Sequence, residues 1–226
     1  MHNLIISLMK PLINASARRV LTPRFTASIA NAMLKNAWQE YRILKKELLR
    51  EENLGARIMV GLAVISEAVF RQLAGKVSER EAYRIFNEIA WAIYSKMGRT
   101  AYLFAGLASK NKYQYLLNAT RLFRAFPFSS PSYRWNDLPA EPGVVAFNCE
   151  RCPVAEYFKT KGNALLGFNT WCQLDYSLAK LWGGTLELSN TIAGGADICD
   201  FRWKAGESEN KYPAGLNQHF RKNTTA

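Results

Sequence analysis

The stretch FPFSSPSYRWNDLPAEP, residues 126–142, divides this sequence into two parts of different character. It carries prolines at positions 127, 131, 139 and 142. Each proline fixes its own backbone and removes a hydrogen-bond donor, so the stretch predicts a loop with short extended pieces. We expect a helical region over residues 1–126, an α+β region over residues 127–204, and a polar, loosely held tail over residues 205–226 within one compact unit.

Hydrophobic periodicity predicts the helices before this stretch. Over residues 28–52, apolar side chains recur at spacings of three and four, at Ala30, Met33, Ala37, Tyr41, Leu44 and Leu48, which is typical of an amphipathic helix. The apolar run 58–70 contains Glu67 and is shorter than the roughly 20 residues that a membrane span needs. It therefore predicts a buried helix.

A second helix start is visible at Ser78. The sequence Ser-Glu-Arg-Glu predicts a capping box, in which Ser78 and Glu81 exchange hydrogen bonds between side chain and backbone. The apolar positions that follow are Ala82, Phe86, Ile89, Ile93 and Met97. Helix formers continue from residue 100 to residue 123, so the helical region extends to the proline-rich stretch.

Alternation of apolar residues predicts strands after residue 142. Residues 143–149 read as one strand, and residues 185–192 and 197–203 form a hairpin around the turn 193–196. A helix over residues 166–182 lies between them. The fold class is therefore α+β: a helical half followed by a small antiparallel sheet with a packed helix.

Composition excludes several functional classes. The chain has 226 residues, 49% of them hydrophobic, and a net charge of +12. The basic residues are spread along the chain without a zinc-finger spacing or an RNA-recognition strand, so we expect a basic solvated surface and no nucleic-acid partner. No P-loop or dinucleotide motif is present, which argues against nucleotide-driven chemistry.

The N-terminal residues do not have the order of a secretory signal. The apolar stretch of residues 1–13 is broken by Lys10 and Pro11, and Arg18 and Arg19 follow it instead of preceding it. We therefore expect a cytoplasmic protein with reduced cysteines. Peripheral membrane contact through residues 4–8 remains an alternative.

Two cysteines have neighbours of chemical interest. On the predicted helix 166–182, Cys172 and Asp175 are three residues apart and face one side together, so they are candidates for a nucleophile and its proton acceptor. A buried thiol beside a surface acid is the structural alternative. On the last strand, Cys199 shares a face with Asp197, and a packed core cysteine is the alternative there.

The remaining cysteines form a C-x-x-C pair, Cys149 and Cys152. A four-thiolate zinc site would need Cys172 and Cys199 to join this pair, and a thioredoxin-like motif would need a different sheet. We expect no metal and no cofactor. His2 and His219 lie near the termini, so acid–base chemistry falls to carboxylates or a thiol; the candidates are Glu156, Asp175, Asp197 and Asp200.

Three segments, taken in order and spacing, resemble the L-2-amino-thiazoline-4-carboxylic acid hydrolase family. They are FNCERCPVAEYF (residues 147–158), WCQLDY (171–176) and TIAGGADICDFR (191–202). The resemblance implies hydrolysis of a cyclic amidine in a small, carboxylate-bearing substrate. The family is also similar to vinyl-reductase-type ligand-binding domains, which have a helical lead followed by an antiparallel sheet.

The resemblance gives the candidate residues their expected roles. Cys172 is the expected nucleophile, with Cys199 as the alternative, and Asp175 and Asp197 are the acid–base candidates. The predicted substrate contacts are Arg151, which suits a two-pronged contact to a carboxylate, together with Cys152, Glu156, Thr191 and Gly195. A small-molecule binding or sensing module without catalysis is the rival function.

Overall fold

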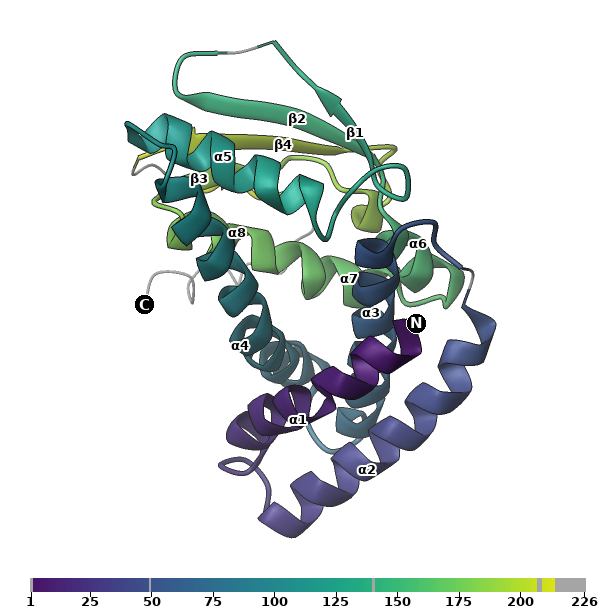
Figure 1. Ribbon diagram of the computed structural model, residues 1–226. Helices are drawn as coiled ribbons and strands as arrows, with labels where there is room; N and C mark the ends of the chain where they lie inside the picture. The colour runs from purple at the N-terminus through teal and green to yellow at the C-terminus, as the bar shows by residue number, and fades with distance from the viewer. Residues whose placement is uncertain (1, 49, 140, 207–208, 214–226) are drawn as a thin grey trace.

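A computed structural model describes residues 2–48, 50–139, 141–206 and 209–213 (Figure 1). The chain first forms a set of helices and then a sheet with further helices, as the sequence predicts. The helices before the proline-rich stretch are α1 (His2–Leu21), α2 (Ala27–Leu44), the 3₁₀ turn η1 (Lys45–Glu47), α3 (Leu54–Leu73), α4 (Glu79–Gly106) and α5 (Lys112–Ala125).

The predicted helical faces are buried, although two helix boundaries differ. The helix expected to reach residue 52 ends at Leu44, while its apolar positions from Ala30 to Leu44 are buried as expected. The helical stretch expected over residues 100–123 is two helices, because the side chain of Asn111 caps a new one by accepting from the backbone of Gln114. Asn at an N-cap starts a helix in this way.

Half of the predicted capping box forms. The Ser78 hydroxyl accepts a hydrogen bond from the Glu81 backbone amide at 3.3 Å. The Glu81 carboxylate does not return the bond, because it pairs with Arg24 and Arg84. The cap nevertheless fixes the start of α4 at Glu79.

The sheet has four antiparallel strands in the order β1-β2-β4-β3. The strands are β1 (Arg134–Asp137), β2 (Val144–Arg151), β3 (Gly184–Glu187) and β4 (Cys199–Ala205). In the pairing of β2 with β4, Cys149 lies opposite Cys199 and Phe147 opposite Phe201. Val145, Phe147 and Cys149 are buried, so the predicted inward face of this strand is confirmed.

The predicted hairpin forms with a longer connection. The strand expected over residues 185–192 ends at Glu187, because the Leu188 amide donates to the carbonyl of Lys211 and the Asn190 amide donates to Asp200. Residues 192–194 form the 3₁₀ turn η2 (Ile192–Gly194). Asp197 consequently lies in an exposed loop and not on the inward face of a strand, which corrects the expectation for that residue.

The helix predicted over residues 166–182 is divided into two. The two parts are α7 (Ala164–Asn169) and α8 (Trp171–Leu181). A further helix, α6 (Pro153–Thr160), precedes them. Thr170 separates α7 from α8 and has a φ of −123° and a ψ of −72°. Its hydroxyl donates to the carbonyl of Leu166. A threonine that bonds the carbonyl four residues back bends a helix at that point.

The elements stack in layers (Figure 1). The sheet lies at the top of the view, α5 and α8 cover one of its faces, and the longer helices α1 to α4 lie below. The close crossing of α4 and α8 depends on Gly98, because a Cβ atom there would lie 2.4 Å from Leu178. The indole of Trp182 also donates to the Gly98 carbonyl at 2.9 Å.

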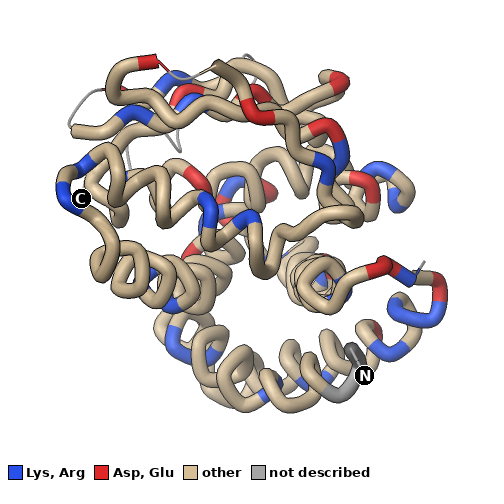
Figure 2. The backbone as a smooth tube through the Cα atoms, turned by 45° about the horizontal axis from the view of Figure 1, so that its top comes forward, with Lys and Arg blue, Asp and Glu red and all other residues tan. Residues whose placement is uncertain are grey.

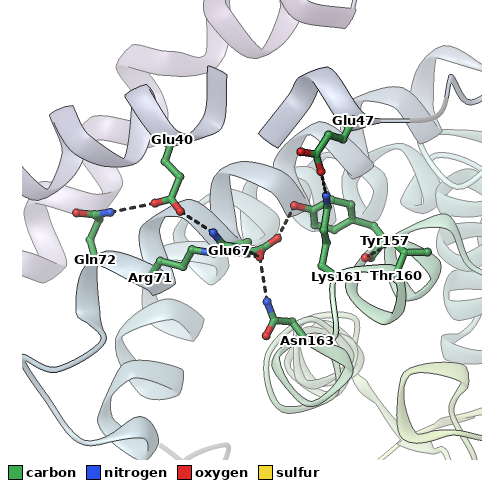
Figure 3. A network of polar contacts seen from close by, with 9 residues as sticks. All are labelled: Glu40, Glu47, Glu67, Arg71, Gln72, Tyr157, Thr160, Lys161 and Asn163. Carbon is green, nitrogen blue, oxygen red and sulfur yellow. Dashed lines mark hydrogen bonds and ion pairs between the residues drawn. The ribbon is translucent and has the colours of Figure 1, made fainter. Parts of the chain in front are cut away.

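A buried ionic network joins α3 to α6 and α7 (Figure 3). Glu67 is fully buried, and its carboxylate accepts from Arg71 at 2.5 Å, from Asn163 at 2.9 Å and from the Tyr157 hydroxyl. Arg71 continues the network to Glu40 on α2 at 2.8 Å. The apolar run that the sequence assigns to a buried helix therefore also anchors the second half of the molecule.

The surface and the end of the chain complete the fold. Lys and Arg positions are distributed over helices and sheet alike in Figure 2, in keeping with a basic solvated surface. Within the four described ranges, no helix has the length and apolar character to cross a membrane.

Part of the C-terminal segment that was predicted to be loosely held contacts the sheet. Lys211, within the described residues 209–213, pairs with Glu187 of β3. Residues 207–208 and 214–226, which include His219, lie outside the described residues.

Candidate active site

A cavity of about 110 Å³ lies between the inward face of the sheet and helices α5, α6 and α8. All four cysteines of the sequence line it, although they come from three separate segments. They are Cys149, Cys152, Cys172 and Cys199, and none of them forms a disulfide. The cavity is thus the place where the thiol chemistry of this chain is concentrated.

Strand register brings together Cys149 and Cys199, which are opposite each other on β2 and β4. The Cys149 thiol donates to the Arg151 carbonyl at 3.1 Å, and its hydrogen bond with Cys199, together with burial, raises the pKa of Cys149. Cys199 accepts a hydrogen bond from the Ile192 backbone amide at 3.3 Å.

Cys152 lies at the N-cap of α6, and Pro153 follows it at the first helical position. Burial raises the pKa of the Cys152 thiol to about 12, and the backbone amides of Val154 and Ala155 oppose this rise. The burial effect is the larger one. Cys152 is therefore a protonated thiol at neutral pH.

Cys172 lies in the first turn of α8, one residue after the helix begins. Burial raises the pKa of its thiol well above the usual value, and the charges of Cys199 and Asp175 act in the same direction. A hydrogen bond with Thr191 opposes the rise. Thr191, a predicted substrate contact, is itself buried and lies beside the predicted nucleophile.

Asp175 lies one turn further along α8 and also lines the cavity. Burial raises the pKa of its carboxyl group to about 7, although the Tyr94 hydroxyl donates to it at 3.1 Å and partly offsets the rise. A carboxyl group with a pKa near the working pH is suited to accept and return protons. The structure thus brings Cys172 and Asp175 to one surface, as their spacing predicts.

Four buried donors that line the cavity have no hydrogen-bond partner within the described part of the chain. We call these groups the unpartnered donors: Arg124 Nε, the Tyr133 hydroxyl, Trp171 Nε1 and Trp203 Nε1. The Tyr133 hydroxyl interacts electrostatically with Cys152, Cys149 and Asp175, so it lies among the reactive groups. Buried donors are normally satisfied, and an exception calls for an explanation such as a bound ligand.

The rest of the wall is strongly aromatic. Phe147 stacks on Phe201 with ring centroids 5.3 Å apart, and Trp182 lies 5.5 Å from Trp203. Such walls exclude water and bind flat or apolar groups, while a few polar atoms fix the orientation of the ligand.

Four predicted site residues lie away from this cavity. Arg151 is engaged by Glu51 at 3.0 Å and by Glu156 at 2.8 Å, so it joins the segment before α3 to α6. Asp197 is exposed, and Gly195 lies in the exposed turn with a φ of +99°. Neither Arg151, Glu156, Asp197 nor Gly195 lines the cavity, so their substrate and acid–base roles stay predictions. Arg151 contacts a thiol only through its backbone carbonyl, which accepts from Cys149.

Sequence reasoning did not single out Tyr94, Arg124, Tyr133 and Trp203 as site residues. Tyr94 and Arg124 come from the helical half, where the local pattern assigns aromatics to the core and basic residues to the surface. Trp203 shares the inward face of β4 with Cys199, so strand alternation was the one signal that could have included it. Among the residues that the structure describes, no three His, Cys, Asp or Glu side chains are arranged to hold a metal ion.

Comparison with known proteins identifies a family. The model of the L-2-amino-thiazoline-4-carboxylic acid hydrolase family matches residues 8–203, which include all the cavity residues. No curated protein and no solved structure matches. The match covers both the helical half and the sheet, whereas the sequence motifs covered only the second half.

Proposed function

Because this chain belongs to the L-2-amino-thiazoline-4-carboxylic acid hydrolase family, we propose that it hydrolyses a cyclic amidine in a small carboxylate-bearing substrate through a cysteine nucleophile. The observation that carries the proposal is the convergence of Cys172, Asp175 and three further thiols on one cavity. An engineered cavity of about 150 Å³ takes up benzene. The cavity found here, of about 110 Å³, is on the scale of a single small ring.

The first step forms a bond between Cys172 and the amidine carbon of the ring. The raised pKa keeps the Cys172 thiol protonated, so a base must accept its proton as the sulfur attacks. Asp175 is one turn away and has a pKa of about 7, which suits this task. A protonated amidine would also place a positive charge beside Cys172 and favour its thiolate.

The second step opens the ring. The ring carbon–sulfur bond of the tetrahedral adduct breaks, and the leaving sulfur takes the proton held by Asp175. The amidine carbon stays bound to Cys172. Water then attacks this carbon and gives one proton to Asp175 and the other to the imine nitrogen, and the Cys172 sulfur leaves with the proton returned by Asp175. The net reaction adds one water and yields an N-carbamoyl amino thiol.

The unpartnered hydroxyl of Tyr133 gives this scheme a donor that interacts with Cys152, Cys149 and Asp175 in the cavity. Burial raises the pKa of Tyr133 well above its usual value, so the group remains a donor throughout the neutral range. A donor that is already in place and has no partner before the reaction stabilises charge that develops in the tetrahedral adduct without a reorganisation cost. We assign this role to Tyr133.

The direct test is product formation. Purified protein incubated with 2-amino-thiazoline-4-carboxylate should release N-carbamoyl cysteine, detected by mass spectrometry and by its new free thiol. The rate should rise with pH through about 7, since Asp175 acts in its ionised form. Absence of ring opening with this substrate and with a panel of cyclic amidines would reject the hydrolase proposal.

A binding module without catalysis is the second candidate, and one observation favours it. The pKa values of Cys149, Cys152 and Cys172 are all raised, so these thiols are weakly reactive near neutral pH. Labelling with iodoacetamide near neutral pH separates the candidates. A binding module should protect its thiols when ligand is added, whereas a hydrolase should consume the ligand.

A further inference from the structure

The cavity contains a cation that neither the family match nor the motifs point to. Of the described residues that line the cavity, Arg124 on α5 is the only basic one and Asp175 the only acidic one. The Arg124 side chain is 15% exposed, and its guanidinium lies 4.2 Å above the centre of the Phe147 ring. A buried cation held over an aromatic face is fixed in position before any ligand arrives.

The guanidinium of Arg124 donates through Nη1 and leaves Nε without a partner among the described residues. Nη1 donates to Asp137, a side chain that is 72% exposed, while Nε is buried and belongs to the unpartnered donors. Nε and Nη2 form the edge on which guanidinium groups bind carboxylates with two parallel hydrogen bonds. An unpartnered donor on a cation is the kind of group to which a carboxylate binds.

The position of Arg124 also fits a ligand of one ring. Phe147, beneath the guanidinium, is two residues from Cys149 along β2, a separation of about 7 Å at 3.3 Å per residue. Trp203, another unpartnered donor, is four residues from Cys199 along β4, or about 13 Å. Along the sheet, the ring that lies beneath Arg124 is therefore nearer to a cysteine of the cavity wall than Trp203 is.

We propose that Arg124 is the residue that binds the substrate carboxylate, in place of the predicted Arg151. Arg151 already has two carboxylate partners, Glu51 and Glu156, and lies away from the cavity. The identity of the ligand in this proposal rests on the proposed hydrolase function. The binding of a carboxylate at Arg124 can be measured without turnover.

The test compares two ligands that differ only in the carboxylate: 2-aminothiazole-4-carboxylate and 2-aminothiazole. Their aromatic rings do not open, and the tryptophans of the cavity wall report binding through intrinsic fluorescence. Wild-type protein should bind the carboxylate at least about tenfold more tightly, as expected for hydrogen bonds to a charged group. Arg124→Met keeps most of the side-chain length and should remove this preference.

Two further variants make the comparison specific. Arg121→Met removes a charge from an exposed position on the same helix and should leave the preference unchanged. Arg124→Lys retains the charge without the two-pronged edge and should reduce the preference in part, which also covers the case that Arg124→Met does not fold.

The outcomes separate this proposal from the hydrolase proposal. A carboxylate preference that persists in both Arg124 variants, or that is absent from the wild type, would overturn the assignment of Arg124. A preference lost in Arg124→Met, in a protein that opens no cyclic amidine, would support Arg124 as an anion site and reject the hydrolase proposal.

Discussion

The Glu67 network and the cavity are both buried and polar, but they differ in how their groups are satisfied. The Glu67 carboxylate accepts from Arg71, Asn163 and Tyr157. The cavity instead holds donors with no partner within the described ranges. A buried donor without a partner costs about 1–3 kcal/mol, so the first cluster stabilises the fold, whereas the second accepts a stability cost that a ligand can relieve.

Breaking the satisfied cluster should give the largest effect on stability. Glu67→Ala leaves the Tyr157 hydroxyl and the Asn163 amide without their buried acceptor, while Arg71 keeps its pair with Glu40, and we expect a loss of about 2–3 kcal/mol in the free energy of unfolding. Urea denaturation would measure it. Glu67→Gln keeps an acceptor in the same place and should lose less. A loss below about 1 kcal/mol in the Ala variant would contradict a structural role for Glu67.

Removing one of the unpartnered donors should slow the reaction without lowering the stability of the fold. Tyr133→Phe deletes only the unpartnered hydroxyl, so the free energy of unfolding should stay the same or increase by up to about 1 kcal/mol. Ring opening should nevertheless slow by about 10²–10³-fold in kcat, as for other donors at a developing charge. Steady-state kinetics beside a thermal melt checks both parts, and an unchanged kcat would remove Tyr133 from the mechanism.

Asp175 should make the cavity sensitive to pH. Its carboxyl group is protonated in both folded and unfolded states below about pH 4. Between there and about pH 7 the unfolded chain ionises while the folded protein does not, because the folded pKa is about 7. Relative to Asp175→Asn, the wild type should therefore lose about 2 kcal/mol of stability between about pH 5 and pH 7.5.

Urea titrations of the two proteins across this range would give the difference directly. Other titrating groups are common to both proteins and cancel. A stability difference that does not change with pH would show that the Asp175 carboxyl group is not protonated in the folded cavity.

A cap in the helical half should give the smallest effect. Ser78→Ala removes the hydroxyl that accepts from the Glu81 amide and should lower the free energy of unfolding by about 1 kcal/mol. Turnover per folded molecule should not change, because Ser78 does not line the cavity. Reduced turnover at full folding would show that the helical half affects the site beyond its stability.

Residue spacing in the sequence predicted which side chains share one face of a strand or a helix. Alternation placed Val145, Phe147 and Cys149 on the buried face of β2, and helical spacing placed Cys172 beside Asp175. These relations hold for any regular strand or helix. The family resemblance, carried by short motifs in the second half, is confirmed over residues 8–203.

The rest of the site depends on contacts between distant segments. Tyr94 meets Asp175 from 81 residues away, and Arg124 reaches Phe147 across the proline-rich stretch. The partner of Arg151 could not be predicted in the same way, because Glu51 is 100 residues away and local spacing does not reveal it. The sequence pattern placed Asp197 on the face of a strand, whereas it lies in an exposed loop. The reason is that hydrogen bonds from Leu188 and Asn190 end the preceding strand at Glu187.

The most direct test of the central claim identifies the sulfur that bonds to substrate. Wild type, Cys172→Ala and Cys199→Ala would each be mixed with 2-amino-thiazoline-4-carboxylate, quenched rapidly and analysed by intact mass and peptide mapping. We predict an adduct of one substrate mass on Cys172 in the wild type and in Cys199→Ala, with adduct and turnover both lost in Cys172→Ala. Full turnover by Cys172→Ala would contradict the account.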